Sequence, residues 1–257
     1  MTTRRIIVSI FALSLFASAS PVSAQRPSPW RDARPLPARV DAEKSVTNPT
    51  AELAQTWLEE GNARFRAQQR RSPNSGLPRV RETAKDGQHP FVTILSCSDS
   101  RVPLEVVFDR GIGDIFVIRV AGNIAGESEI GSIEYGVEHV GTPLLVVLGH
   151  TKCGAVTAAA THAHTEGHIT GIVGKIQPAV EKVKNANSEI KDEELVKNAT
   201  IENIWGSVKK LMESSEILRH SVKEKKLRVI GALYNVETGG VEWLGEHADM
   251  TKLIGGH

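Results

Sequence analysis

Two short motifs contain both cysteines of this chain, and each motif follows a run of apolar residues. The first motif, CSDSR, begins at Cys97, and the second, GHTKCG, contains His150 and Cys153. Two thiolates and one imidazole form a Cys2His set, which holds a catalytic zinc ion through three protein ligands and leaves a fourth position for water or substrate. The motifs therefore predict a reactive zinc site with Cys97, His150 and Cys153 as its ligands.

The spacing within the second motif supports this interpretation. A lone histidine is usually a solvated or core residue, but His150 lies three positions before Cys153 at an expected strand-to-helix turn, from which both side chains can reach one ion. Tetrahedral sites of nitrogen and sulfur ligands favour zinc. If a helix begins at Cys153, the positive end of its dipole favours the thiolate form that binds metal.

A disulfide between Cys97 and Cys153 is the main alternative. The chain begins like an exported protein, and an even pair of cysteines in an oxidising compartment usually forms a bridge. A domain of this size does not need a single bridge, however, and a bridge would leave Asp99, Arg101 and His150 without a role. We therefore prefer metal ligation.

A carboxylate and a guanidinium, Asp99 and Arg101, lie directly after the first cysteine. As an exposed salt bridge they would contribute only about 0 to 1 kcal/mol and carry no function. Beside a metal ion, Arg101 can keep Asp99 ionised through charge-assisted hydrogen bonds. Asp99 would then either take the fourth position on zinc or accept a hydrogen bond from zinc-bound hydroxide.

The N-terminus has the pattern of a cleavable secretory signal over residues 1–24. Arg4 and Arg5 precede an apolar run that is too short to span a membrane, and small residues precede Gln25. Removal of this segment changes the formal charge from +1 to −1, so no basic nucleic-acid surface is indicated. We expect an exported protein, periplasmic or secreted, without a membrane anchor after cleavage.

The remaining chain divides into a proline-rich arm over residues 25–50 and a single zinc-dependent catalytic domain over residues 51–257. Within the domain, apolar runs rich in β-branched residues alternate with helical patterns. The expected strands cover residues 91–95, 115–120, 144–148 and 227–233, and the expected helices cover residues 51–69, 128–140, a run from 153, and 172–219.

This alternation predicts an α/β fold, with a mostly parallel sheet of four core strands covered by helices on both faces. Gly239 and Gly240 separate two alternating segments, which predicts an antiparallel hairpin at the sheet edge. Ligands of such sheets gather beyond the carboxyl ends of the strands. Cys97 and His150 are each expected at such an end.

Four segments together resemble the β-carbonic anhydrases: CSDSR, RVAGN at residues 119–123, SIEYGVEHVG at residues 132–141, and GHTKCG. The resemblance covers residues 53–244. It implies the reversible hydration of carbon dioxide to bicarbonate and a proton, with one zinc ion per subunit. It also implies that Asp99 and Arg101 are the catalytic dyad that orients zinc-bound hydroxide.

The resemblance further implies a small substrate pocket, built partly across a dimer interface. The residues that match the pocket of the family are Gln88, Phe116, Ala121, Tyr135 and Gly154. Gln88 would donate a hydrogen bond to an oxygen of carbon dioxide or bicarbonate. The expected partner is a second copy of the chain, in a homodimer or a dimer of dimers.

One subgroup of the family has an inhibitory bicarbonate site and a tryptophan three residues before the first cysteine. Here that position is Ile94. We therefore predict the open type, in which water rather than Asp99 occupies the fourth position on zinc near neutral pH.

Two other functions fit the motifs. A hydrolase of the same fold that acts on carbon disulfide or carbonyl sulfide needs the same zinc chemistry, and a non-catalytic zinc-stabilised binding domain needs only the ligands. A cluster of histidines, His162, His164 and His168, is either a solvated loop or a proton shuttle or accessory metal patch.

Overall fold

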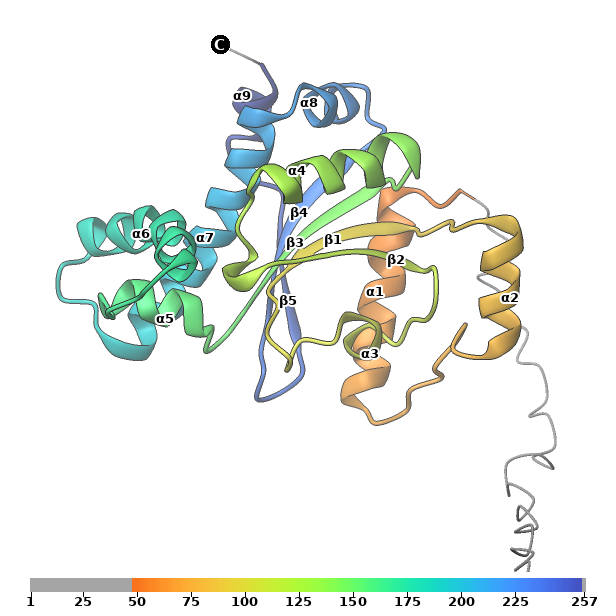
Figure 1. The fold of residues 1–257 in the computed structure, drawn as a ribbon, viewed down its shortest axis with the longest axis horizontal. Coiled ribbons are helices and arrows are strands. Elements are labelled where there is room, and N and C mark those ends of the chain that lie inside the picture. Colours follow the sequence, from red (N-terminus) through yellow and green to blue (C-terminus); the bar gives the residue numbers. More distant parts are fainter. Residues whose placement is uncertain (1–47, 256–257) are drawn as a thin grey trace, which may run out of the picture. The chain divides into compact units, whose positions relative to one another are not determined.

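The computed structural model describes residues 48–255 and has an α/β fold, as the sequence predicts (Figure 1). Its five-stranded sheet has the order β2-β1-β3-β4-β5. Four strands are parallel and β5 is antiparallel to β4, which confirms the edge hairpin. The strands are β1 (Val92–Ser96), β2 (Ile115–Arg119), β3 (Leu144–His150), β4 (Arg228–Tyr234) and β5 (Val241–Gly245). The expected signal and almost all of the proline-rich arm lie outside the described residues.

Helices connect and cover these strands. They are α1 (Ala51–Arg66), α2 (Leu77–Asp86), α3 (Leu104–Val107), α4 (Glu127–Glu134), α5 (Gly154–Ala160), α6 (His168–Ala186), α7 (Asp192–Ser214), α8 (Glu216–Lys223) and α9 (Met250–Gly255), together with a 3₁₀ turn η2 (Ala121–Asn123) and a π turn η3 (Tyr135–His139). No helix within residues 48–255 is long and apolar enough to cross a bilayer.

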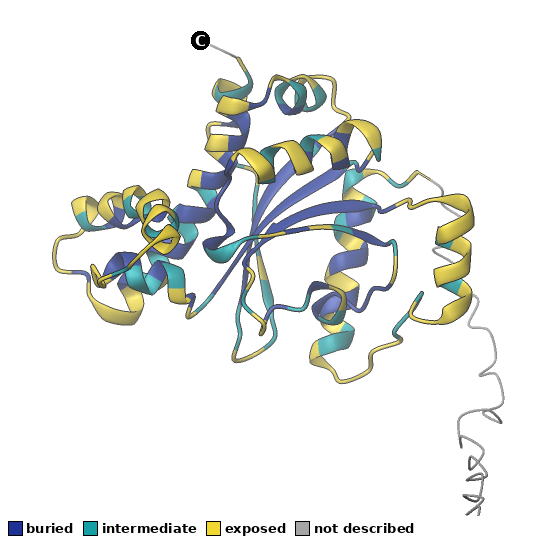
Figure 2. Cartoon of the chain, in the orientation of Figure 1, coloured by how far each residue is buried: buried dark blue, intermediate teal, exposed yellow. Residues whose placement is uncertain are grey.

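The two faces of the sheet belong to two different hydrophobic clusters. On one face, β1, β3 and β4 pack against α1 and α3 through residues such as Leu58, Ile94 and Val146. On the other face, the same strands pack against α4, α7 and α8 through residues such as Val147 and Ile204. Figure 2 shows the central strands as buried throughout. This two-sided cover explains why the central strands are continuous apolar runs rather than alternating ones.

Helix α1 is capped at its N-terminus and is hydrogen-bonded to two distant segments through one buried side chain, Asn62. Thr50 caps the helix, since its Oγ1 accepts a hydrogen bond from the Leu53 amide at 3.3 Å. Nδ2 of Asn62 donates to the carbonyl oxygens of Val107 and Gly239, at 3.2 and 2.8 Å. Asn62 thereby links α1 to α3 and to the β4–β5 hairpin.

The turn after α3 carries a carboxylate, Asp109, whose side chain is fully buried. Arg64 donates to Asp109 at 2.6 Å, and the backbone amides of Arg71 and Ser72 donate at 3.0 and 2.8 Å. Burial alone raises the pKa of this carboxyl, but the three donors outweigh it and hold the pKa below its ordinary value. Asp109 fixes the loop that joins α1 to α2.

Three helical regions differ from the sequence-based expectation. The helical region expected over residues 172–219 is divided into α6, α7 and α8, because the backbone is extended at Asn187 and again at Ser215, which caps α8. The helix expected over residues 128–140 ends as the π turn η3. Helix α2 was not expected, because it has no buried residue and therefore no apolar stripe that faces the core.

Candidate metal centre

The register of the sheet brings the two motifs together. Ser96 pairs with Leu148 on the neighbouring parallel strand, so Cys97 and His150 leave β1 and β3 at the same edge. Cys153 follows three residues later, as the N-cap of α5. The ligand atoms of Cys97, His150 and Cys153 all lie within 4.8 Å of one another, and all three residues are buried. The structure therefore assembles the predicted ligand set at the carboxyl edge of the sheet.

The imidazole of His150 is arranged to bind a metal through Nε2. Its Nδ1 lies 2.9 Å from the carbonyl oxygen of Thr151, which can only accept, so Nδ1 carries the proton. The Nε2 lone pair is then free, and this atom is buried without a hydrogen-bond partner among the described residues. An unpartnered buried nitrogen beside two sulfur atoms fits the borderline-soft zinc ion.

Both cysteines are free thiols, so the alternative disulfide is not formed in the structure. A hydrogen bond from the Cys153 thiol lowers the pKa of Cys97, and the Gly122 amide assists at 3.3 Å from the sulfur. The same contact and burial raise the pKa of Cys153. The backbone amides of α5 act in the opposite direction, as the helix dipole predicts, but they are outweighed. The hydrogen bond between the two sulfur atoms therefore favours one thiolate in the pair, on the side of Cys97.

Asp99 and Arg101 form a closely bonded ion pair beside these ligands. Arg101 donates to Asp99 through its backbone amide at 2.9 Å, through Nε at 2.9 Å and through Nη2 at 2.7 Å. These bonds hold the pKa of Asp99 well below its usual range. Nη2 of Arg101 also donates to the carbonyl oxygen of Lys152 at 3.0 Å. The pair thus bridges the two motifs.

Residues of the β4–β5 hairpin bind the second motif, GHTKCG, through hydrogen bonds and an ion pair. The Thr151 amide donates to the Tyr234 carbonyl oxygen at 2.9 Å, and the Val236 amide donates to Oγ1 of Thr151 at 3.1 Å. Lys152 and Glu237 form an exposed ion pair at 2.7 Å. These contacts fix the path of the chain between His150 and Cys153.

Two contacts to Cys97 come from Arg119 and Gly122 of the RVAGN segment, neither of which is among the site residues expected from the sequence. Nε of Arg119 donates to the Cys97 carbonyl oxygen at 2.9 Å, and the Gly122 amide donates to the Cys97 sulfur. The recurrence of this segment in the family was the signal for these contacts. Backbone donors such as the Gly122 amide cannot be assigned from residue types alone.

The predicted pocket residues fall into two groups in a single chain. Ala121 immediately precedes Gly122, and Gly154 immediately follows Cys153, so both lie beside the metal ligands. Phe116 pairs with Thr93, four residues before Cys97, which corresponds to about 13 Å along the strand. Tyr135 packs on Phe116 with ring centroids 6.0 Å apart.

Gln88 lies still further from the ligands, before the amino end of β1, whereas Cys97 lies beyond its carboxyl end. The five residues of β1 span about 16 Å. The structure of one chain therefore does not bring Gln88, Phe116 and Tyr135 to its own metal ligands.

The histidine cluster does not form a second metal group in the described part of the chain. His162, His164 and His168 are all exposed. Nε2 of His162 lies 3.3 Å from Nζ of Lys184, and His164 lies 3.5 Å from Glu166. Within residues 48–255, the ligand set at Cys97 is the one group of three such side chains whose ligating atoms converge.

Comparisons with known proteins agree with this geometry. The sequence profile of the family described as "Carbonic anhydrase" matches residues 92–241. A carbonic anhydrase of Mycolicibacterium smegmatis is 34% identical over 80% of this chain and 98% of its own length. Carbonic anhydrase 2 of Mycobacterium tuberculosis is 36% identical over 75% of this chain and 91% of its own length.

Solved structures give the same result. The β-carbonic anhydrase CafA of Aspergillus fumigatus superposes with a TM-score of 0.62 at 27% identity, over 79% of this chain and 95% of that chain. A tetrameric β-carbonic anhydrase of Sordaria macrospora superposes with a TM-score of 0.60 at 25% identity, over 66% and 87% of the two chains. An α/β fold with a Cys2His group that could hold zinc at the edge of its sheet is the arrangement expected of a zinc enzyme. This chain belongs to the carbonic anhydrase family, in its β class.

Proposed function

We propose that this protein hydrates carbon dioxide reversibly to bicarbonate and a proton, with Asp99 in direct contact with the reacting water. The observation that carries the proposal is the convergence of three metal-ligand atoms within 4.8 Å, beside a carboxylate that is ionised and fixed. When zinc is bound, it lowers the pKa of water and so supplies a nucleophile near neutral pH. A purely structural zinc site has no need of Asp99.

The hydrogen bonds of Asp99 support its role as an acceptor. A carboxylate has about four acceptor positions, and Arg101 fills three of them. The remaining position can accept the hydrogen of one water molecule and so direct the lone pair of its oxygen toward carbon dioxide. Arg101 is a positioning residue in this mechanism, because it acts through Asp99.

The same hydrogen bonds support the open type of site. Both carboxylate oxygens of Asp99 are already bonded to Arg101, and Asp99 is not among the three residues whose ligand atoms converge. Direct binding of Asp99 to the metal would occupy the one acceptor position that Arg101 leaves free. With water at the fourth position on the metal, that acceptor position can hold the water instead.

We further propose that a second copy of the chain completes the substrate pocket. The β2 strand is an edge strand of the sheet and Val117 on it is exposed, as is half of Tyr135. Gln88 and Phe116 lie too far from Cys97 to serve the metal of their own chain. Two chains that meet along β2 can each supply these residues to the other, which fits the tetrameric state of the relative from Sordaria macrospora.

Mixed oligomers test this arrangement. Gln88→Ala and Cys97→Ser are each expected to have low activity, the first through loss of a substrate contact and the second through loss of metal. In a mixed dimer, the intact metal site of one chain meets the intact Gln88 of the other. Activity that rises on refolding the two variants together supports the exchange, and no gain above the separate variants contradicts it.

We also propose that the protein is exported, with cleavage after Ala24. The support is the basic, apolar and small-residue pattern of residues 1–24. N-terminal sequencing of protein recovered from the periplasm or medium of expressing cells is expected to begin at Gln25. A chain that keeps its original terminus in the cytoplasm would contradict export.

The decisive test of the activity is zinc content measured together with the rate of carbon dioxide hydration on the purified full chain. We expect one zinc ion per subunit and hydration that depends on it. Parallel assays with carbon disulfide and carbonyl sulfide test the rival hydrolase. A higher kcat/KM for either sulfur compound would overturn the proposed substrate, and zinc binding without any of these activities would favour the binding domain.

A further inference from the structure

We propose that two polar side chains of α7, Asn203 and Ser207, are positioning residues for the metal centre. They act through the turn over residues 120–123, which delivers a backbone amide to the sulfur of Cys97. This inference rests on the proposed metal chemistry at Cys97. Sequence patterns indicate only core packing for this helix, because most of its other buried residues are apolar.

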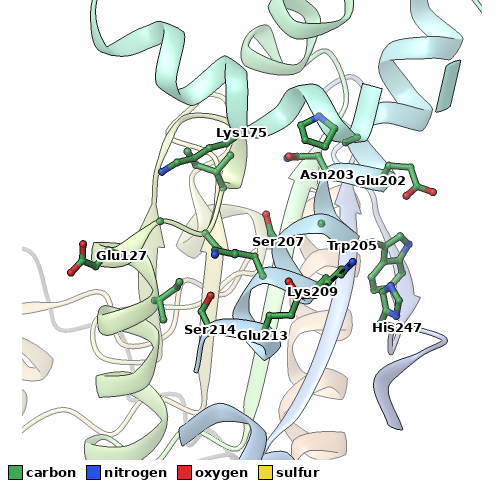
Figure 3. Close-up of a pocket in the computed structure, with 18 of the residues that line it drawn as sticks. Glu127, Lys175, Glu202, Asn203, Trp205, Ser207, Lys209, Glu213, Ser214 and His247 are labelled. Carbon is green, nitrogen blue, oxygen red and sulfur yellow. Dashed lines mark ion pairs between the residues drawn. The ribbon is translucent and has the colours of Figure 1, made fainter. Parts of the chain in front are cut away.

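The contacts of these two side chains are short and buried. Nδ2 of Asn203 donates to the carbonyl oxygen of Gly122 at 2.7 Å. Oγ of Ser207 donates to the carbonyl oxygen of Asn123 at 2.8 Å. The residues are 3% and 5% exposed and lie one helical turn apart, on the same face of α7. Figure 3 shows both on α7, where they also line a groove of about 1150 Å³.

The turn that they hold has a left-handed backbone at two successive residues, one of which, Asn123, is not glycine. Gly122 and Asn123 are consecutive left-handed residues, with φ of 73° and 44°. The left-handed φ of Gly122 favours glycine, and a Cβ atom there would lie 2.6 Å from Cδ1 of Ile176, which would have to move. Residues in such conformations persist where their surroundings fix them from several sides. The two hydrogen bonds from α7 fix the carbonyl groups of both residues.

The function of this turn is to present the Gly122 amide to the Cys97 sulfur, at 3.3 Å. A hydrogen bond to a coordinating thiolate withdraws electron density from the sulfur and orients it toward the metal. Removal of either α7 contact is expected to loosen the Gly122 amide. The metal would then be held less tightly, and the electronic state of the thiolate would change.

A purely structural role predicts a different result. Asn203 and Ser207 also satisfy two buried carbonyl groups, so their loss lowers the stability of the fold in either case. A structural role leaves the metal unchanged in the molecules that remain folded. The measurement must therefore report on the metal rather than on activity or stability.

The test uses the full chain with Asn203→Leu or Ser207→Ala, and Thr200→Val as the matched control. Thr200 is fully buried on the same helix, but its hydroxyl bonds to Val196 within α7. Two properties are measured: the rate at which zinc is lost to an excess of chelator, and the thiolate-to-metal absorption band of the cobalt(II) protein. We expect about tenfold faster zinc release in both variants and a shifted cobalt band, with the control equal to the wild type.

Zinc release and cobalt spectra that match the wild type in both variants would overturn the inference. If Asn203→Leu does not fold, Ser207→Ala decides alone, since that change removes one hydroxyl from a helix. Failure of the proposed function has a separate signature in the wild-type chain, which would then either take up no zinc or cobalt at Cys97 or bind zinc without hydrating carbon dioxide.

Discussion

Nε2 of His150 lies 3.8 Å from Oδ2 of Asp99, although the two residues leave different strands of the sheet. His150 uses its other nitrogen to hold Thr151, and Asp99 is held by Arg101. A metal-binding nitrogen and a fixed carboxylate are therefore neighbours that do not bond to each other. In the proposed mechanism this arrangement separates the metal ligands from the carboxylate that orients water, so we expect that the two functions can be removed independently.

Asp99→Asn is expected to keep zinc and to lose about 100-fold in activity. This factor is the lower end of the range for loss of a group that assists proton transfer. The amide has the same shape as the carboxylate, but it is not ionised and cannot accept hydrogen bonds at both of its ends. Zinc content and stopped-flow carbon dioxide hydration are the measurements. Ser100→Ala, an exposed change in the same turn, is the control. Normal turnover by Asp99→Asn would refute the role of the carboxylate.

Arg101→Lys tests whether geometry or charge fixes Asp99. Lysine keeps the positive charge, but it lacks the planar fork that bonds both carboxylate oxygens and reaches Lys152. We expect full zinc content with activity about tenfold lower, the smaller effect typical of residues that orient others. An unchanged kcat/KM would mean that charge alone is sufficient.

Removal of the metal is expected to destabilise the fold, because zinc binds the folded chain and the three ligand atoms converge only there. At free zinc 100-fold above its Kd, the free energy of unfolding rises by about 2.7 kcal/mol. Urea unfolding with chelator and with added zinc measures this difference. Cys153→Ser lacks one ligand, so its unfolding should not respond to zinc. If zinc raised the stability of the wild type and of Cys153→Ser equally, the metal would bind at a different site.

Asp109→Asn is expected to lower the free energy of unfolding by about 3 kcal/mol at neutral pH, because it removes the charge that Arg64 needs in a buried pair. The native pKa of Asp109 is lowered, so its contribution is complete above the ordinary value of about 3.9 and is lost as the pH falls through the native pKa. Urea unfolding is measured from pH 7 to pH 3. The difference in the free energy of unfolding between Asp109→Asn and the wild type should become smaller as the pH falls. A difference that widens in acid would contradict this assignment.

The ligand set and the sheet could be predicted from sequence because each has a strong local signal. The central strands are buried on both faces and appear in the sequence as continuous apolar runs. Cys97 directly follows one of these runs, and His150 is the last residue of another. Parallel strands place their carboxyl ends at one edge, so two distant motifs could be joined without knowledge of the loops. The breaks between α6, α7 and α8 depend on single extended residues, such as Asn187, and gave no comparable signal.

Contacts made by backbone atoms could not be predicted. The Gly122 amide reaches Cys97 only because the turn is left-handed at two successive residues. Asn203 and Ser207 stand on a helix whose apolar stripe indicates packing, and their carbonyl partners lie 81 and 84 positions away in the chain. Helix α2 gave no signal for the opposite reason, since it buries nothing within one chain.

The length of β1 has a consequence for how this enzyme behaves on dilution. A strand of five residues keeps Gln88 and Cys97 beyond opposite ends of β1, so in the proposed dimer each chain would contribute to two different pockets. Below the Kd of the proposed dimer, specific activity would fall in proportion to enzyme concentration while the zinc content per chain stayed constant. Metal loading would then be a property of the chain, and catalysis a property of the pair.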